Sequence, residues 1–392
     1  MRALFIVFLK ELRENARDRR TLLTALVLGP LGAPLLFTVL MNVTLQRSQQ
    51  RAAQALELTV AGGDHAPNLV AFLRQQGTHV VPFAGDAATA AEAVRAQRQK
   101  LVLVVPANYG ARLRAGAPAA LQLVADSSDA SAASDHARAG ALLRAYGNQL
   151  AALRLQARGL APTLVQPLIV DDVDVSTPAG RALLVLGMLS FFIVFATLMG
   201  GLYVATDATA GERERGSLEP LLTTPVARRD IVFGKILATS AYMFLSLALT
   251  IAAFAVCLDF VPLESLGMSA NFGPRVALAI FAIMAPFVPL GAALMTVVAS
   301  FTRSYREAQS WLTALVLVPT LPIIFAAIYQ VPTRTALMWI PSLSQHLLVN
   351  ALLRAEPLHA VDVAISAGIA LAGGALLALV AARLYQREAI LG

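Results

Sequence analysis

The sequence predicts an α-helical integral membrane protein, in which six transmembrane helices carry an extracytoplasmic α/β domain between the first and the second. Three observations predict this fold class. Of the 392 residues, 57% are hydrophobic and only 14% are charged, whereas soluble globular proteins carry about 25% charged residues. Six apolar stretches are long enough to cross a bilayer, which takes roughly 20 residues. One polar insert, 46–180, is long enough to form a core of its own.

The N-terminal segment 1–20 is predicted to be an amphipathic helix on the cytoplasmic membrane surface. Apolar residues at positions 4, 5, 8, 9 and 12 have helical spacing, and the charged residues fall on the other face. A helix of this kind, rich in basic residues, lies along the membrane interface rather than across the bilayer.

The membrane spans follow from length and hydropathy. The first apolar run exceeds the h-region of a signal peptide, about 7–15 residues, so we expect an uncleaved anchor. The single cysteine, Cys257, falls within the third span, which excludes an intramolecular disulfide. The expected spans are 21–45, then, within 181–392, five further transmembrane helices at 182–206, 233–258, 276–301, 311–330 and 361–382.

Helix-breaking residues occur inside several spans, and they leave two interpretations open. Broken helices that line a cavity and ordinary kinks both fit them. The segment 339–357 is apolar but interrupted by polar residues, so it is predicted to be a re-entrant or interfacial segment on the outer side. The helix breakers are Gly29, Pro30, Pro34, Pro286, Pro289, Gly291, Pro319 and Pro322.

Basic residues predict the orientation. They gather before the first span, in the loop 205–235, in the link 302–309 and in the C-terminal tail. Because basic residues favour the cytoplasmic side of a membrane, both termini and the loop 205–235 are predicted to be cytoplasmic. The insert 46–180 is then extracytoplasmic. The same clustering beside the spans accounts for the net charge of +7, so we expect no nucleic acid partner.

The insert reads as alternating strands and helices, which is typical of a small α/β domain. Three aspartates near its end, Asp171, Asp172 and Asp174, fit either a cation site or, as we prefer, a solvated strand end. Strands are expected at 56–62, 79–83, 100–106 and 120–126, and helices at 65–76, 87–99 and 130–159.

Catalytic motifs are missing from the sequence. The stretch FGK at 233–235 lacks the first glycine and the hydroxyl residue of a nucleotide-binding loop. H-E-x-x-H and G-x-S-x-G do not occur, and the five histidines are dispersed. We therefore expect a chain that is not an enzyme, with no metal site and no bound cofactor.

The loop between the second and third spans carries a resemblance. GERERGSLEPLLTTPVARRDIVFGK, at 211–235, resembles the cytoplasmic signature of the type-2 ABC exporter permeases. KELRENARDRRTLLTALVLGPLGAPLL at 10–36 and REAQSWLTALVLVPTLPII at 306–324 resemble the sodium-exporter permease branch, NatB, of that family. The matching loop positions are Glu212, Arg213, Glu214, Gly216, Ser217, Leu218, Glu219, Leu221, Leu222, Thr224, Pro225, Val226, Gly234 and Lys235.

The resemblance implies a multi-pass permease subunit of an exporter in the bacterial plasma (inner) membrane. Its partners would be a separate ABC ATPase on the cytoplasmic face, which binds ATP and Mg²⁺, and a second permease copy or homologue. The loop would contain the coupling helix. Leu218, Leu221 and Leu222 also have the spacing of one helical face, and a short apolar ridge suits docking in a partner's groove.

Three groups of residues are candidates for function. The ATPase-coupling candidates, on a helix expected over 212–226, are Glu212, Glu214, Gly216, Leu218, Glu219, Leu222 and Pro225. The interface or gate candidates are Arg13, Arg17, Asp18, Arg19 and Arg20. The weaker pathway candidates are Thr197, Gln309 and Asn350.

The substrate and two rival functions stay open. Resemblance to the sodium-exporter branch favours Na⁺, yet the apolar spans offer no carboxylate cluster for a bare cation, so a drug, peptide or lipid-like substrate fits equally. A secondary transporter would need charged groups at the midplane. A membrane-anchored sensor or binding module would use 46–180 but would not need six spans.

Overall fold

The computed structural model describes residues 2–18, 22–126, 128–165, 176–264 and 267–386. It consists of two compact units. Unit 1 comprises Met1–Gln46 and Val175–Gly392, and unit 2 comprises Arg47–Asp174. Each unit is described by itself below.

Unit 1 is a helical bundle, and the predicted number of spans is confirmed. Within the described ranges, six helices are long and apolar enough to cross a membrane: Ala25–Arg47, Leu189–Glu214, Arg228–Leu258, Pro274–Ser300, Tyr305–Tyr329 and Ala360–Leu384. The elements that build them are η1 (Leu23–Leu28), α3 (Gly29–Ala53), α9 (Leu189–Thr206), η4 (Asp207–Gly211), α10 (Glu212–Glu214), α12 (Arg228–Leu258), α13 (Pro274–Met284), α14 (Phe287–Ser300), α15 (Tyr305–Tyr329) and α17 (Ala360–Leu384).

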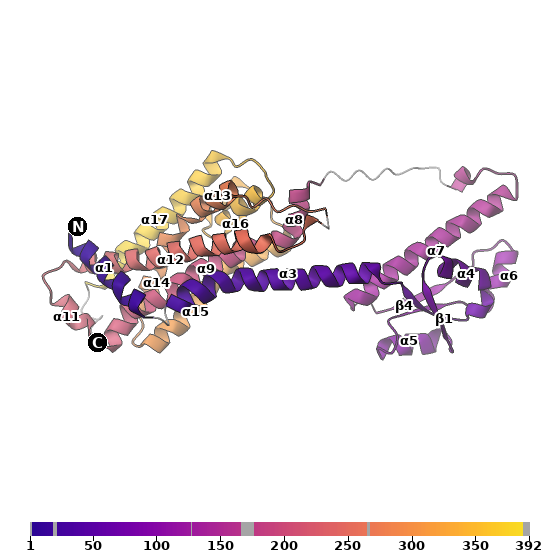
Figure 1. The fold of residues 1–392 in the computed structure, drawn as a ribbon, viewed down its shortest axis with the longest axis horizontal. Helices are drawn as coiled ribbons and strands as arrows, with labels where there is room; N and C mark the ends of the chain where they lie inside the picture. The colour runs from indigo at the N-terminus through magenta and orange to yellow at the C-terminus, as the bar shows by residue number, and fades with distance from the viewer. Residues whose placement is uncertain (1, 19–21, 127, 166–175, 265–266, 387–392) are drawn as a thin grey trace. The chain divides into compact units, whose positions relative to one another are not determined.

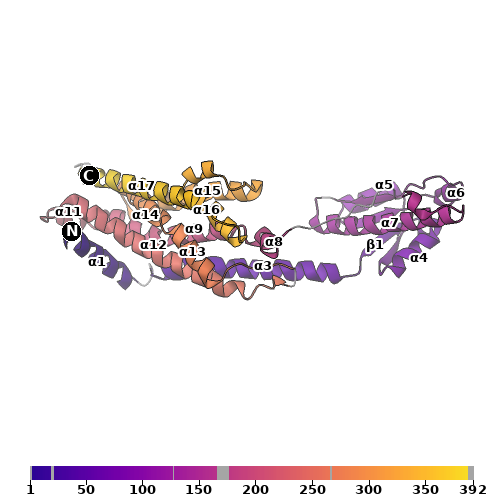
Figure 2. The same ribbon diagram turned by 90° about the horizontal axis from the view of Figure 1, so that it is seen from above.

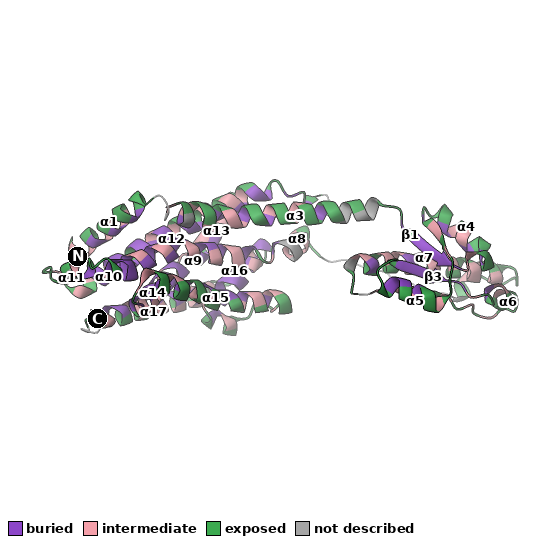
Figure 3. Ribbon diagram, turned by 90° about the horizontal axis from the view of Figure 1, so that it is seen from below, coloured by how far each residue is buried: buried purple, intermediate pink, exposed green. Residues whose placement is uncertain are grey.

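Helix α9 forms the centre of the bundle. It packs against α12, α14 and α15, and 72% of its most apolar window is buried, compared with 17% for α17. Figure 3 shows α9 largely buried, whereas α3 is mostly exposed. Exposed leucines and valines on α3, α15 and α17 leave apolar faces for lipid or for a second protein.

Proline acts differently in two of the spans. The predicted span 276–301 is divided into α13 and α14, with Ala285 and Pro286 between them, because proline lacks a backbone N–H and clashes with the preceding turn. In α15, Pro319 and Pro322 lie inside a continuous helix.

The predicted outer segment 339–357 contains a short helix. Helix α16 (Leu343–Leu353) follows the 3₁₀ turn η6 (Thr335–Trp339), and most of its residues are buried. Its 11 residues rise only about 17 Å at 1.5 Å per residue, against a hydrocarbon core of about 30 Å. The helix therefore cannot cross the bilayer, and its position on the outer side stays a prediction.

Helices from the beginning, the middle and the end of the sequence meet at one end of unit 1. Helix α1 (Arg2–Arg17), the short helix α11 (Leu218–Leu222) and the C-terminal end of α17 occupy one end of the bundle (Figures 1 and 2). A hydrogen bond from Arg228, the first residue of α12, to the carbonyl of Tyr385 belongs to this end (3.2 Å). Helix α8 (Pro178–Leu186) lies at the other end (Figure 1).

Unit 2 has an α/β fold. Its described part holds a four-stranded sheet in the order β2-β1-β3-β4, formed by β1 (Glu57–Ala61), β2 (His79–Phe83), β3 (Leu101–Val104) and β4 (Gln122–Ala125). Strand β1 is parallel to β2 and β3, and β4 is antiparallel to β3. The predicted strands and helices are present in this order, but Asp171, Asp172 and Asp174 lie outside the described residues.

Helices cover both faces of this sheet. Helix α4 (Pro67–Gln75), α6 (Tyr109–Arg114) and the long α7 (Ala130–Gln156) share one apolar cluster with β1 and β3. Helix α5 (Ala87–Arg95) packs in a second cluster, on the opposite face (Figure 1). The four buried residues of β3, LVLV, are apolar on both faces because both faces are covered. The 3₁₀ turns η2 (Gly63–His65) and η3 (Pro162–Val165) complete the described elements.

Candidate functional site

A buried cluster of charges joins three elements at one end of unit 1. Lys235, in α12, is 1% exposed, and its ammonium donates to Glu11 Oε1 of α1 (3.1 Å) and to the carbonyl of Ala208 in η4 (2.6 Å). It also donates to the carboxylate of Glu212 in α10. Since an ammonium has three N–H donors, every donor of Lys235 has a partner. Lys235 therefore binds α1, the end of α9 and α12 to one another.

A second lysine completes the cluster from the more exposed side. The ammonium of Lys10 contacts Glu11 (3.1 Å) and Glu14 (3.0 Å) and also pairs with Glu212. Burial alone would lower the pKa of Lys10, but the carboxylates of Glu11 and Glu212 outweigh it and raise that pKa. Lys10 therefore stays charged at neutral pH.

The three carboxylates of the cluster have the spacing of a cation site. Oxygens of Glu11, Glu14 and Glu212 lie within 4.8 Å of one another. The ammonium of Lys10 contacts all three carboxylates and so supplies the positive charge that a metal ion would supply. This cluster is an ion-pair network, and it gives no reason to expect a bound metal.

Packing brings α1 close enough for these pairs to form. A Cβ atom at Gly234 would lie 2.8 Å from Val7 Cγ1 and 3.1 Å from the carbonyl of Leu4, so a residue without a side chain is needed where the helices cross. Val7, Glu11 and Asn15 form the buried stripe of α1, at spacings of four residues. In the FGK stretch, Gly234 therefore lets α1 and α12 approach closely, and the next residue, Lys235, forms the ion pairs.

The loop residues of the motif anchor two neighbouring helices. Arg213 donates to the carbonyl of Ser300 (3.0 Å) and to that of Thr302, at the C-terminal end of α14. Glu214 accepts from the backbone N–H of Tyr305, the first residue of α15 (2.6 Å). Helix ends leave such backbone groups without partners, so these two side chains cap the helices on either side of the link at 302–304.

The predicted helix over 212–226 is wrong, because the segment forms two short helices. Gly216 ends α10 in the left-handed conformation, with φ 67°, and the N–H groups of Gly216 and Ser217 bond back to the carbonyls of Arg213 and Glu212 (both 3.0 Å). This closure is a common helix ending that glycine favours. Helix α11 begins two residues later, at Leu218.

The structure separates the coupling candidates. Glu212 and Leu218 are buried (both 2% exposed), so neither forms part of an exposed docking surface. Glu214, Gly216 and Pro225 are exposed. Glu219 and Leu222 lie in α11, and their coupling role stays a prediction.

The interface and pathway candidates are dispersed. Arg13, Arg17 and Asp18 are exposed at or just after α1, and Arg19 and Arg20 lie outside the described residues. Thr197 is buried in α9, where its hydroxyl donates to the carbonyl of Ile193 (2.7 Å). Gln309 is half-buried in α15, and Asn350 is half-buried in α16.

Asn350 belongs to a neutral polar network that the sequence analysis did not find. The hydroxyl of Ser190 in α9 lies 2.6 Å from His346 Nδ1, and Asn350 Nδ2 lies 3.2 Å from His346 Nε2. Gln345 donates to the hydroxyl of Ser366 in α17 (3.0 Å), which in turn donates to that of Ser344 (2.8 Å). These bonds connect α16 with α9 and α17.

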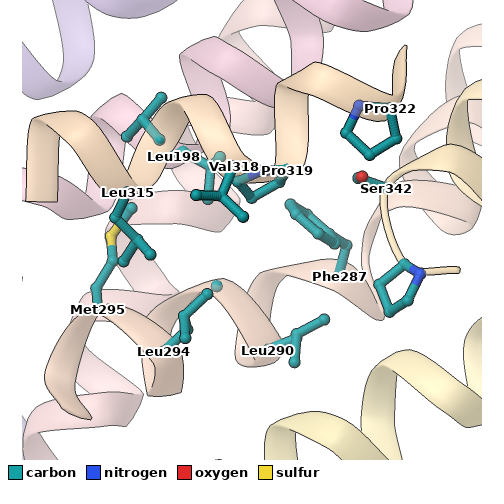
Figure 4. Close-up of a pocket in the computed structure, with 13 residues that line it drawn as sticks. Leu198, Phe287, Leu290, Leu294, Met295, Leu315, Val318, Pro319, Pro322 and Ser342 are labelled. Atoms are coloured by element: carbon teal, nitrogen blue, oxygen red, sulfur yellow. The ribbon is translucent and has the colours of Figure 1, made fainter. Parts of the chain in front are cut away.

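A cavity of about 290 Å³ lies among α9, α14, α15 and the residues before α16 (Figure 4). Its wall is apolar apart from Ser342. The lining residues are Leu198, Phe287, Leu290, Gly291, Leu294, Met295, Leu315, Val316, Val318, Pro319, Pro322, Pro341 and Ser342. A cavity of this composition suits an apolar molecule better than a bare cation.

The motif, the bundle and the missing nucleotide-binding loop agree with the comparisons to known proteins. The chain is similar to the ABC transporter permease protein NatB of Bacillus subtilis (strain 168), with 23% identity over 354 residues, covering 88% of this chain and 89% of the relative. The family model described as "ABC-2 family transporter protein" matches residues 19–383. The chain therefore belongs to the ABC-2 family of transporter proteins and is a membrane permease.

Proposed function

We propose that this permease is the membrane subunit of an ATP-driven exporter and that a separate ABC ATPase binds the end of unit 1 formed by α1 and α11. The observation that carries the proposal is the buried cluster of Lys235, Glu11 and Glu212. It connects the exposed α1 to two membrane spans, so a force applied to α1 reaches the spans.

Energy has to come from another subunit, since the sequence contains no nucleotide-binding loop. The ATPase would contact the exposed face of α1, with Arg13 and Arg17, and the loop that holds α11. Arg213 and Glu214 extend the same connection to α14 and α15 through their backbone caps. Movement of this end would therefore act on four spans together.

The proposed orientation follows from charge. Basic residues at this end favour the cytoplasm, so both termini and the loop 205–235 would be cytoplasmic in a bacterial plasma (inner) membrane. Unit 2, which follows the first span, would be extracytoplasmic. The exposed apolar side chains of α3, α15 and α17 would face lipid and a second permease copy.

An apolar, drug-like or lipid-like substrate is favoured by the cavity among α9, α14 and α15. A bare cation would need a carboxylate as a ligand, but the carboxylate of Glu212 is already paired with two lysines. Export of Na⁺ is the second candidate. It is supported by the resemblance of 10–36 and 306–324 to the sodium-exporter branch.

The partner proposal is tested by co-purification of the ATPase with tagged permease. Glu219→Lys and Leu222→Asp, both in α11, should each reduce the recovered ATPase at least tenfold, because they change charge and polarity in the proposed contact. Arg74→Asp, at an exposed position of unit 2 outside the proposed contact, serves as the control and should retain it. Full recovery of ATPase by both α11 variants would contradict docking on α11.

The substrate proposal is tested in vesicles that contain the permease and its ATPase. ATP-dependent movement of a hydrophobic fluorescent dye, lost in Leu294→Trp, which enlarges a side chain that lines the cavity, is the expected result. ATP-dependent ²²Na⁺ movement without dye movement would replace the apolar substrate by Na⁺. ATP-independent movement of either solute would contradict the exporter proposal itself.

A further inference from the structure

A second hollow, in unit 2, lies at the edge of the sheet where the parallel strands end. Its volume is about 600 Å³, within the range of roughly 300–1,000 Å³ typical of small-molecule sites. The wall is formed by the ends of β1 and β3, by residues that follow β1, β2 and β3, and by the beginning of β4; it includes Gly62, His65, Asp86, Val105, Ala107 and Arg112.

The topology explains why this edge is open. The chain runs from β1 outward to β2 and then returns across β1 to β3. The segments after β1 and β3 lead to α4 and α6 on one face, and the segment after β2 leads to α5 on the other. In open α/β sheets, loops that diverge to opposite faces leave a crevice outside the carboxyl ends of the strands, and ligands bind there.

The wall between β1 and β3 is fixed before any ligand binds. Gly62 has a φ of 70°, and a Cβ atom there would lie 2.3 Å from the carbonyl oxygen of Val105. The same oxygen lies 3.2 Å from His65 Nδ1. The segment after β1 is therefore held against the end of β3, and a bound molecule would meet a formed surface.

The hollow presents one positive and one negative side chain. Arg112 donates through Nε to the carbonyl of Pro118 (2.7 Å), which orients its guanidinium. No described protein group bonds its two terminal nitrogens. Asp86 accepts the N–H groups of Ala88 (3.1 Å) and Thr89 (2.9 Å) at Oδ1, and within the described residues Oδ2 has no such partner.

The negative charge of Asp86 persists at neutral pH, because hydrogen bonds from the backbone and side chain of Thr89 lower the pKa of its carboxyl. The rest of the wall is mixed: Ala61, Val104 and Val105 are apolar, and His65, Asn108 and Gln122 are polar. A complementary ligand carries an anionic group, a cationic group and a small apolar body.

We infer that this hollow binds a small zwitterion of the α-amino acid type, either a free amino acid or the termini of a short peptide. Its carboxylate would pair with Arg112, in the fork geometry that guanidinium and carboxylate share. Its ammonium would pair with Asp86. Unit 2 is then a ligand-binding module in addition to the transport function of unit 1, and binding does not depend on the presence of an ATPase.

The test uses the full chain in lipid nanodiscs and saturation-transfer NMR. The probes are a pool of the twenty L-amino acids and, separately, L-alanyl-L-alanine, so the two sources are distinguished. We expect transfer to at least one probe, with binding weakened at least tenfold by Arg112→Gln and by Asp86→Asn, which keeps an oxygen for the α5 cap. Ala107→Trp should abolish binding by filling the hollow, and Arg74→Gln, an exposed arginine of α4, should not change it.

Matched analogues of the bound probe sharpen the result. The same molecule without its amino group, and the same molecule without its carboxylate, should each bind at least tenfold more weakly. No transfer to any probe at 10 mM would overturn the inference. Undiminished binding by Ala107→Trp, or equal binding of a single-charge analogue, would overturn it as well.

Discussion

Two buried polar clusters in the described part of unit 1 are built on different principles. Around Lys235, charged groups from α1, α10 and α12 neutralise one another. Along α16, neutral side chains exchange hydrogen bonds with α9 at His346 and with α17 at Gln345. Removing the buried charge of Lys235 leaves two buried carboxylates with one partner fewer, at about 3–5 kcal/mol. Removing one neutral group costs about 1–3 kcal/mol. We therefore expect the ionic cluster to hold its three elements together more strongly than the neutral cluster does.

The largest effect is expected for Lys235→Met. Its removal leaves the carboxylates of Glu11 and Glu212 buried with only Lys10 as a partner, so the free energy of unfolding should fall by about 3–5 kcal/mol. Urea unfolding in detergent measures this change. Lys100→Met, at an exposed site in unit 2, is the matched control. A change below about 1 kcal/mol for Lys235→Met would mean that the ionic cluster contributes no more than a surface pair.

Gly234→Leu should come next, because it separates the helices that carry the ionic cluster. A side chain there collides with Val7, and such overpacking costs about 1–3 kcal/mol. Val7→Ala in the same chain should restore a small part of the loss, because it removes the nearest colliding atom, Val7 Cγ1, but keeps Val7 Cβ. If Gly234→Leu is as stable as the wild type in the same unfolding measurement, the crossing of α1 and α12 is incorrect.

Ser190→Ala tests the neutral cluster. It leaves His346 Nδ1 without its hydroxyl partner, so we expect a loss of about 1–3 kcal/mol, smaller than that of Lys235→Met. Thermal unfolding followed by circular dichroism checks the order. Thr313→Ala, which removes an exposed hydroxyl on α15, provides the baseline. A larger loss for Ser190→Ala than for Lys235→Met would reverse the comparison between the two clusters.

The smallest effect is expected for Lys10→Gln. The Lys10 side chain is 41% exposed, and Lys235 still pairs with Glu11 and Glu212 in its absence. We therefore expect a loss below about 1 kcal/mol, the usual value of an exposed ion pair, that diminishes as salt is added. Unfolding curves at low and high ionic strength measure it. A loss that does not depend on salt would place Lys10 with the buried charges.

The sequence predicts the spans well because hydropathy over about 20 residues reflects a single physical requirement, the burial of a helix in hydrocarbon. The alternation of strands and helices in unit 2 can likewise be predicted from local sequence patterns. The helix break at Gly216 was also available from sequence, since glycine followed by a new start residue is a common helix ending. The helical spacing of the leucines favoured one continuous helix instead. In the structure, Leu218 is buried within the chain itself.

The ion pairs could not be predicted from local sequence patterns. Glu11 and Lys235 are separated by 224 positions, and no periodicity in either helix specifies that they meet. The sequence analysis placed the charged residues opposite the apolar positions 4, 5, 8, 9 and 12, whereas the structure buries Glu11 beside Val7 and Asn15, where a charged residue requires a partner. The network of Ser190 and His346 likewise depends on how α16 packs against α9, which hydropathy does not encode.

We propose that the ionic cluster transmits force from the ATPase to the spans. Glu11→Gln is the sharpest test of this coupling, because it removes one charge of α1 while Lys235 keeps its pairing with Glu212. ATP hydrolysis and substrate transport are measured together in vesicles that contain the complete complex. We expect hydrolysis to continue while transport per ATP falls at least tenfold. Transport that stays in its wild-type proportion to hydrolysis would contradict it.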